Sequence, residues 1–103
     1  MSLFDSDADS KITVIATIRA KSGHEADVRK AFAALVEPAR LEAGCLSYQL
    51  LEDKYYTGSF FTFEEWTSEQ LLEEHLARIK EGLNQSKAWL QDDVRICVVK
   101  PVI

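Results

Sequence analysis

Residues 59–75 read SFFTFEEWTSEQLLEEH, and the change of pattern inside this stretch decides the fold. Its first half, Ser59 to Trp66, is rich in aromatic residues and is typical of a β-strand. Immediately afterwards the apolar positions take helical spacing. Thr67 is the expected N-cap, because Gln70 follows it at the spacing of a capping box. A strand that leads directly into a helix predicts a mixture of one sheet with its helices.

The rest of the chain after this point predicts the end of the helix and one more strand. Helical spacing of apolar residues extends to Leu83. Gly82 and Asn84 weaken the pattern, so we expect a break before a last helical piece near residues 85–91. Residues 93–100 (DVRICVVK) are typical of a strand.

The chain before residue 59 begins with the same two kinds of element. Residues 11–20 (KITVIATIRA) alternate with the period of a strand. A helix is expected from His24 to about residue 43, opened by a capping box between Ser22 and Glu25. Pro38 lies inside it and lacks a backbone amide, which predicts a kink or a break.

Two further strands complete the expected order. Gly44 is a natural helix stop, residues 45–53 alternate as a strand, and residues 54–58 are short enough for a hairpin loop. The resulting order, β-α-β-β-α-β, predicts an α+β fold of the ferredoxin-like, split βαβ type with a four-stranded antiparallel sheet. We expect one such domain over residues 11–103, preceded by a flexible tail over residues 1–10.

Apolar residues occur on both faces of the expected strands, as in the neighbours Val14 and Ile15 or Phe60 and Phe61. Helices cover one face of a sheet of this type. The second face needs another layer, and the chain has no further helices to provide it. The pattern therefore predicts a homodimer that forms through the open sheet face.

Composition excludes several classes of partner. The chain of 103 residues has a formal net charge of −5 and no basic cluster, which argues against binding to nucleic acid or to an anionic membrane. No apolar run approaches the roughly 20 residues of a membrane span, and no signal peptide is recognisable. Cys45 and Cys97 match no metal spacing and are expected to be buried thiols in a reducing cytoplasm.

Four residues are candidates for a functional site. His75 lies on the apolar stripe of the second helix, where a ring facing the interior can act as acid or base, or can be a core histidine bonded to a backbone carbonyl. Trp66 can form a pocket wall or simply pack against the helix. Glu64 shares a strand face with Trp66 and can orient His75, unless it is an ordinary surface carboxylate. Tyr48 adds aromatic surface to a pocket or to the core.

The sequence contains no dinucleotide fingerprint, phosphate-binding glycine loop, zinc-type cluster or nucleophile elbow. Three stretches in order resemble the antibiotic-biosynthesis monooxygenase family: ITVIA at residues 12–16, EAGCLSY at residues 42–48, and FEEW at residues 63–66 followed by His75. The resemblance spans residues 11–101.

This resemblance implies a dimeric α+β barrel with a pocket between sheet and helices, and oxidation of a small phenolic or quinol-type substrate by O₂ without metal, flavin or other cofactor. It assigns His75 as the catalytic base or oxyanion partner, with Trp66, Glu64 and Tyr48 around the substrate. Ala16 stands where haem-degrading relatives carry asparagine, which argues against haem degradation. A small-carbonyl isomerase that uses His75, or a non-catalytic ligand-binding, stress-associated dimer, would also suit the scaffold.

Overall fold

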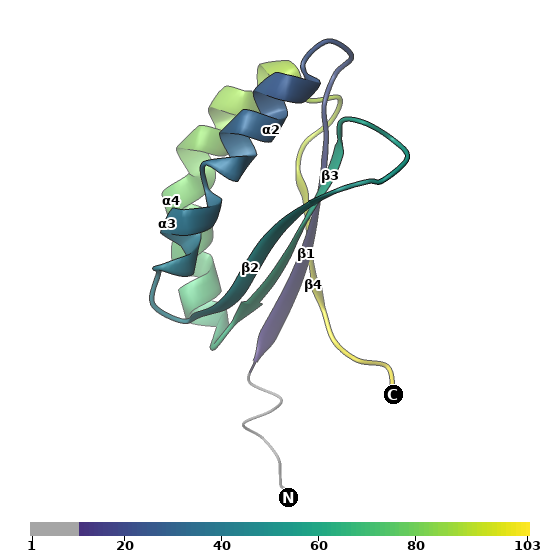
Figure 1. Cartoon of the computed structure of the whole chain (residues 1–103). Helices are drawn as coiled ribbons and strands as arrows, with labels where there is room; N and C mark the ends of the chain where they lie inside the picture. The colour runs from purple at the N-terminus through teal and green to yellow at the C-terminus, as the bar shows by residue number, and fades with distance from the viewer. Residues whose placement is uncertain (1–10) are drawn as a thin grey trace, which may run out of the picture.

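The computed structural model describes residues 11–103, and the predicted tail over residues 1–10 lies outside them. The elements follow the predicted β-α-β-β-α-β order, with the first helix divided in two and a short 3₁₀ turn added after the last (Figure 1). They are β1 (Ile12–Arg19), α2 (Glu25–Ala33), α3 (Val36–Arg40), β2 (Cys45–Glu52), β3 (Ser59–Trp66), α4 (Glu69–Ser86), η1 (Lys87–Trp89) and β4 (Arg95–Val99). The ferredoxin-like α+β fold is confirmed.

The four strands form one sheet in the order β2-β3-β1-β4, with every neighbouring pair antiparallel. All three helices lie on one side of this sheet (Figure 1). Alternation along β1 buries Val14, Ala16 and Ile18 beneath the helices and turns Ile15 to the opposite side. The sheet therefore has a covered face and an open face.

The proline in the first helical region divides it, as predicted. α2 ends at Ala33 and α3 restarts at Val36, so that Pro38 falls in the first turn of a new helix. An amide at that position has no partner within the helix, and the missing proline amide is therefore tolerated there. The predicted capping box is wrong: His24 is the N-cap without a side-chain bond, while the Glu25 carboxylate accepts the amide of Gly23.

The second helix differs from its prediction at both ends. Its N-cap is Ser68 and not Thr67, because the Ser68 hydroxyl accepts the amide of Leu71. The predicted break at Gly82 and Asn84 does not occur, and the helix continues to Ser86. A helical glycine costs only about 1 kcal/mol, and the packing of Leu83 against the core offsets that cost. The predicted last helical piece shrinks to η1.

The last strand is shorter than predicted, since β4 covers Arg95–Val99 and not residues 93–100. β4 pairs only with β1, over the register from Thr13↔Val99 to Thr17↔Arg95. Residues beyond that register have no partner strand, so the extended chain on either side is not part of the sheet.

The interior consists of two clusters along the helix-covered face. One is formed by Ile18, Ala20, Val28, Phe32, Phe60 and Leu90. The other is formed by Val14, Ala39, Tyr48, Trp66 and Leu72. The second cluster lies beneath α3 and the first half of α4 and includes two of the predicted site residues.

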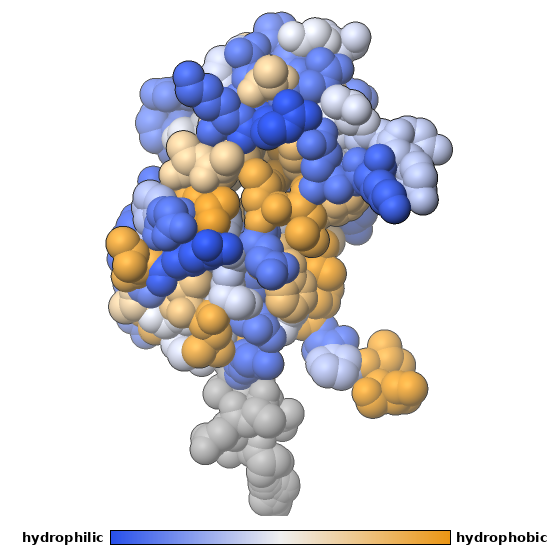
Figure 2. Space-filling view, viewed as in Figure 1, coloured by the Kyte–Doolittle hydropathy of each residue, from blue (hydrophilic) through white to orange (hydrophobic). Residues whose placement is uncertain are grey.

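The open face of the sheet is markedly apolar. Cross-strand neighbours place Phe63 beside Ile15, and Ile15 beside Cys97, with Phe61 and Leu51 paired in the next row. Figure 2 shows apolar side chains along the strands, both next to the helices and out to the edge of the molecule away from them. Within residues 11–103, no helix is long and apolar enough to cross a membrane.

Candidate functional site

His75 is buried between the second helix and the sheet, with only 1% of its side chain exposed. Its position on α4 turns the ring toward β3 and β2. The ring lies 4.6 Å from that of Trp66, tilted by 34°, and 5.6 Å from that of Tyr48 in an edge-on arrangement. Three of the four predicted site residues are therefore in contact, with His75 packed against the Tyr48 and Trp66 rings of the second core cluster.

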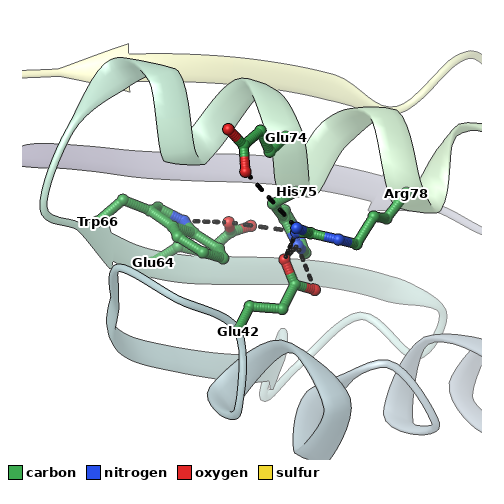
Figure 3. A network of polar contacts seen from close by, with 6 residues as sticks. All are labelled: Glu42, Glu64, Trp66, Glu74, His75 and Arg78. Carbon is green, nitrogen blue, oxygen red and sulfur yellow. Dashed lines mark hydrogen bonds and ion pairs between the residues drawn. The ribbon is translucent and has the colours of Figure 1, made fainter.

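The Nδ1 atom of His75 is bonded to the carboxylate of Glu42, at 3.1 and 3.0 Å from its two oxygens (Figure 3). A carboxylate only accepts hydrogen bonds, so Nδ1 carries the proton. One of the two interpretations of His75 from the sequence is a core histidine whose ring bonds a backbone carbonyl. The partner is instead an acidic side chain from the loop between α3 and β2.

The other ring nitrogen faces a second carboxylate. Nε2 of His75 lies 3.9 Å from Oε1 of Glu64 and has no hydrogen-bond partner among the described residues. Glu64 accepts the Thr62 hydroxyl at 2.7 Å and the Trp66 indole N–H at 3.0 Å. Glu64 is thus a buried carboxylate oriented by two donors and directed toward His75, not a solvated surface group.

The backbone fixes both carboxylates in place. Glu64 stands directly opposite Tyr48 on β2 and Val14 on β1, in the middle of the sheet. Glu42 is held by the turn at Gly44, which has φ +85° and whose carbonyl accepts the Thr67 amide at 2.8 Å. This bond ties the Glu42 loop to the segment that leads into α4, where His75 is located.

A basic residue completes the network on its solvent side. Arg78 donates to Oε1 of Glu42 at 2.7 Å and lies 3.6 Å from Glu74 (Figure 3). It follows His75 by three residues, so both project from the same side of α4. The sequence alone does not single out Glu42, Arg78 or Thr62 as site residues. Helical spacing could have suggested Arg78, and Glu42 begins one of the stretches that carry the family resemblance.

A small cavity lies between the sheet and the helices next to this network. Its volume is ≈ 20 Å³, which is room for about one water molecule. Its polar lining consists of Tyr48, Thr62 and Glu64. The rest of the lining is hydrocarbon: Ala16, Ile18, Phe32, Leu35, Leu76, Ile79, Leu83, Val94 and Ile96. His75 and Trp66 lie behind Glu64 and are not part of this wall.

An open groove of ≈ 300 Å³ lies between α4 and the β4 side of the sheet. It shares four apolar lining residues with the small cavity: Leu76, Leu83, Val94 and Ile96. Lys80 and Lys87 line the same groove. The shared side chains separate the buried carboxylate from a surface hollow large enough for a small ligand.

The phenol of Tyr48 stays neutral in this setting. Burial raises its pKa above the usual 10, and the charges of Glu64 and Glu42 raise it further. Tyr48 can therefore donate a hydrogen bond into the cavity but does not act as a base near neutral pH. Burial also raises the pKa of the Cys45 thiol, again with help from Glu64. That thiol is consequently a poor nucleophile.

The site chemistry is that of acids and bases. Within residues 11–103, no group of three or more histidine, cysteine, aspartate or glutamate side chains is arranged to hold a metal ion. What the residues do provide is a Glu–His–Glu line whose inner end borders a cavity. Such a line can take up a proton from a bound molecule or return one to it.

Comparison with known proteins identifies the family. Residues 11–81 match the model of the antibiotic biosynthesis monooxygenase family. The chain belongs to this family. It is similar to a solved antibiotic biosynthesis monooxygenase, with 28% identity and a TM-score of 0.80, over 89% of this chain and 99% of that one.

Other relatives of this antibiotic biosynthesis monooxygenase family member have known structures. Protein PA3566 from Pseudomonas aeruginosa is 33% identical with a TM-score of 0.83, over 91% of this chain and 96% of that one. Rv0793 from Mycobacterium tuberculosis is 28% identical with a TM-score of 0.82, over 91% of this chain and 97% of that one.

A longer protein is similar in sequence. The uncharacterized protein sll1783 of Synechocystis is 34% identical over 68 residues. The match covers 66% of the chain and 46% of that relative, which is therefore about twice as long as the matched region.

Proposed function

We propose that this protein is a cofactor-independent monooxygenase that oxidises a small phenolic or quinol-type aromatic substrate with O₂. The observation that carries the proposal is the buried Glu64–His75 pair at the edge of a hydrocarbon-lined cavity. A phenol becomes a strong reductant when it loses its proton, and an apolar enclosure keeps water away from the resulting anion. Acid–base residues and a dry cavity are the two contributions that the protein must make.

The net reaction needs no electron carrier. A substrate RH₂ and O₂ give R=O and H₂O, so the substrate supplies all four electrons that O₂ accepts and both hydrogens of the water, and one oxygen atom enters the product. The protein would bind the ring, remove one proton and later return it. Tyr48, with its neutral phenol, would donate a hydrogen bond to the oxyanion of the substrate.

Substrate binding requires the cavity to expand. A cavity of ≈ 20 Å³ is far below the roughly 150 Å³ that holds a benzene ring. The four apolar side chains shared with the outer groove are the partition that must move. Their movement would join the two hollows and place a ring against Glu64, Thr62 and Tyr48.

The proposal includes a homodimer formed through the open sheet face. That face presents Ile15, Leu51, Phe61 and Phe63 in register, and an apolar surface of this kind is typical of protein interfaces. A second copy offers the same surface with matching shape, so a two-fold pairing would cover both sheets.

Oxygen uptake with a panel of quinols and polycyclic phenols tests the function. We expect uptake by the native chain, its loss in Glu64→Gln and His75→Ala, and no change in Glu52→Gln, a carboxylate paired with Arg29 away from the cavity. Absence of uptake, together with saturable ligand binding that survives His75→Ala, would instead support a non-catalytic binding protein. Isomerisation of a small carbonyl compound without oxygen consumption would support the isomerase alternative, which would use the same Glu–His pair.

A further inference from the structure

The cavity lining decides which side chain can accept a proton from a bound molecule. Every lining residue belongs to the described part of the chain, and only Tyr48, Thr62 and Glu64 among them are polar. The Thr62 hydroxyl already donates to Glu64. Tyr48 keeps its own proton because burial raises its pKa. Glu64 is therefore the one base that borders the cavity.

His75 stands one step further from the cavity, with an unsatisfied nitrogen. A buried nitrogen without a hydrogen-bond partner destabilises the folded chain, because it has lost its bond to water and gained none in return. The unpaired Nε2 lies 3.9 Å from Oε1 of Glu64, so a small movement of either side chain would bring the two atoms to hydrogen-bond distance. One proton placed between them satisfies both atoms, whether it resides on the carboxyl or on the imidazole. The geometry is that of a pair that shares and passes one proton.

From His75 the polar contacts lead outward to the surface. The side chain of His75 is 1% exposed, that of Glu42 is 13% exposed, and that of Arg78 is 53% exposed. Each is bonded to the next, through Nδ1 to the Glu42 carboxylate and from there to the guanidinium. The network thus forms a bonded polar path from His75 to solvent, and a gap of 3.9 Å between Nε2 and Glu64 separates it from the cavity wall (Figure 3).

We propose that Glu64 is the catalytic base that accepts the phenolic proton of the substrate and passes it to His75. From His75 the proton reaches solvent by way of Glu42. Arg78 is a positioning residue that holds the Glu42 carboxylate against the imidazole. This inference rests on the proposed function, since the substrate's hydroxyl group supplies the proton.

The proton transfers balance without any electron transfer. The substrate O–H bond breaks and the proton binds Glu64, which leaves a phenolate. The Glu64 O–H bond then breaks as an N–H bond forms at Nε2 of His75, while the proton on Nδ1 moves to Glu42 and on to water. The reverse sequence delivers one proton to the reduced oxygen and restores the starting tautomer. A complete turnover therefore releases no net proton, whereas binding alone releases one.

The test uses 4-nitrocatechol, whose colour changes when it is deprotonated, mixed with the native chain under argon. Stopped-flow absorbance follows ionisation of the probe, and a pH indicator in weak buffer follows protons that reach solvent. The native chain should bind the probe as its anion and release about one proton. Glu64→Gln should bind it as the neutral phenol. Glu42→Gln and Arg78→Gln should ionise it but lose the fast phase of proton release.

Several controls separate a relay from a structural role. Glu64→Asp should restore ionisation, and imidazole added to His75→Gly should restore fast proton release, which a merely structural histidine would not allow. Glu52→Gln should behave as the native chain. Arg78 is on the surface, so its variant should fold even if the buried substitutions do not, and unfolding curves show which variants are intact.

The two proposals can fail separately. If folded Glu64→Gln ionises the probe as the native chain does, while folded His75→Gln does not, the inference is overturned and His75 is the base. Unchanged proton release in folded Glu42→Gln and Arg78→Gln would also overturn it. Normal ionisation and relay without oxygen uptake on any quinol would refute the monooxygenase and leave the relay standing.

Discussion

The side chain of Leu71 lies against the α-carbon of Gly44 and leaves no space for a Cβ atom there. Gly44 also has φ +85°, a conformation that costs other residues about 1–2 kcal/mol. This contact joins the loop that carries Glu42 to the first turn of α4. It therefore sets the distance between the Glu42 carboxylate and the helix that carries His75.

We expect Gly44→Ala to destabilise the protein by about 2–5 kcal/mol, the sum of about 1–2 for backbone strain and about 1–3 for overpacking. Gly23→Ala is the matched control, because Gly23 has φ +89° and nothing within 4 Å of its would-be Cβ. Gly23→Ala should lower the free energy of unfolding only by the backbone strain, because its new methyl group meets no other atom. Urea unfolding of the two variants measures the difference, and equal losses would mean that the Leu71 contact is not rigid.

The buried phenol of Tyr48 predicts a loss of stability at alkaline pH. Its pKa in the folded chain is raised above the usual 10, so above that pH the unfolded chain releases a proton that the folded chain retains. The free energy of unfolding then falls as pH rises. Comparing Tyr48→Phe with the native chain cancels the other titrating groups. The native chain should lose more stability above pH 10 than the variant does, and parallel curves would contradict the raised pKa.

The partition between groove and cavity predicts a specific effect on catalysis. Ile96→Trp should fill the space that the substrate crosses and lower kcat/KM for a quinol tenfold or more, equivalent to at least about 1.4 kcal/mol. Val98→Trp is the control, since Val98 lies two residues further along β4 and lines neither hollow. Equal effects of the two substitutions would show that the substrate arrives by another route.

The open sheet face predicts the effect of a single charge on assembly. Phe63→Glu places a carboxylate between Ile15 and Gln49 on that face and should convert a dimer to monomer. Tyr55→Glu, at a loop residue that is 81% exposed, should leave the dimer intact. Light scattering at micromolar concentration gives the mass of each. A native chain that is already monomeric would refute the dimer.

The strands and the presence of the helices could be predicted because each kind of element spaces its buried apolar residues with its own period. Alternation located all four strands, and the missing amide of Pro38 located the division of the first helix. The helix ends were less certain, because Thr67 and Ser68 are equally plausible caps by composition. Only the direction of the Ser68 hydroxyl toward the Leu71 amide distinguishes them.

The site could be predicted only in part, because local patterns show which way a side chain faces but not which distant residue it meets. Helical spacing indicated that His75 faces the interior, and strand alternation placed Glu64 with Trp66. The bond from Glu42 to His75 spans 33 residues of chain, and no local pattern encodes such a contact. The size of the cavity could not be predicted either, because it depends on how side chains from six elements and two connecting segments pack together.

The small cavity lies at the junction of the two interior clusters. Ile18 and Phe32 on its wall belong to one cluster and Tyr48 belongs to the other, while Leu35 comes from the break between α2 and α3. β1, β3 and α4 run through both clusters, whereas the first helical region is interrupted between them. Any enlargement of the cavity is therefore expected first at this break beside Leu35, where no continuous element ties the two clusters together.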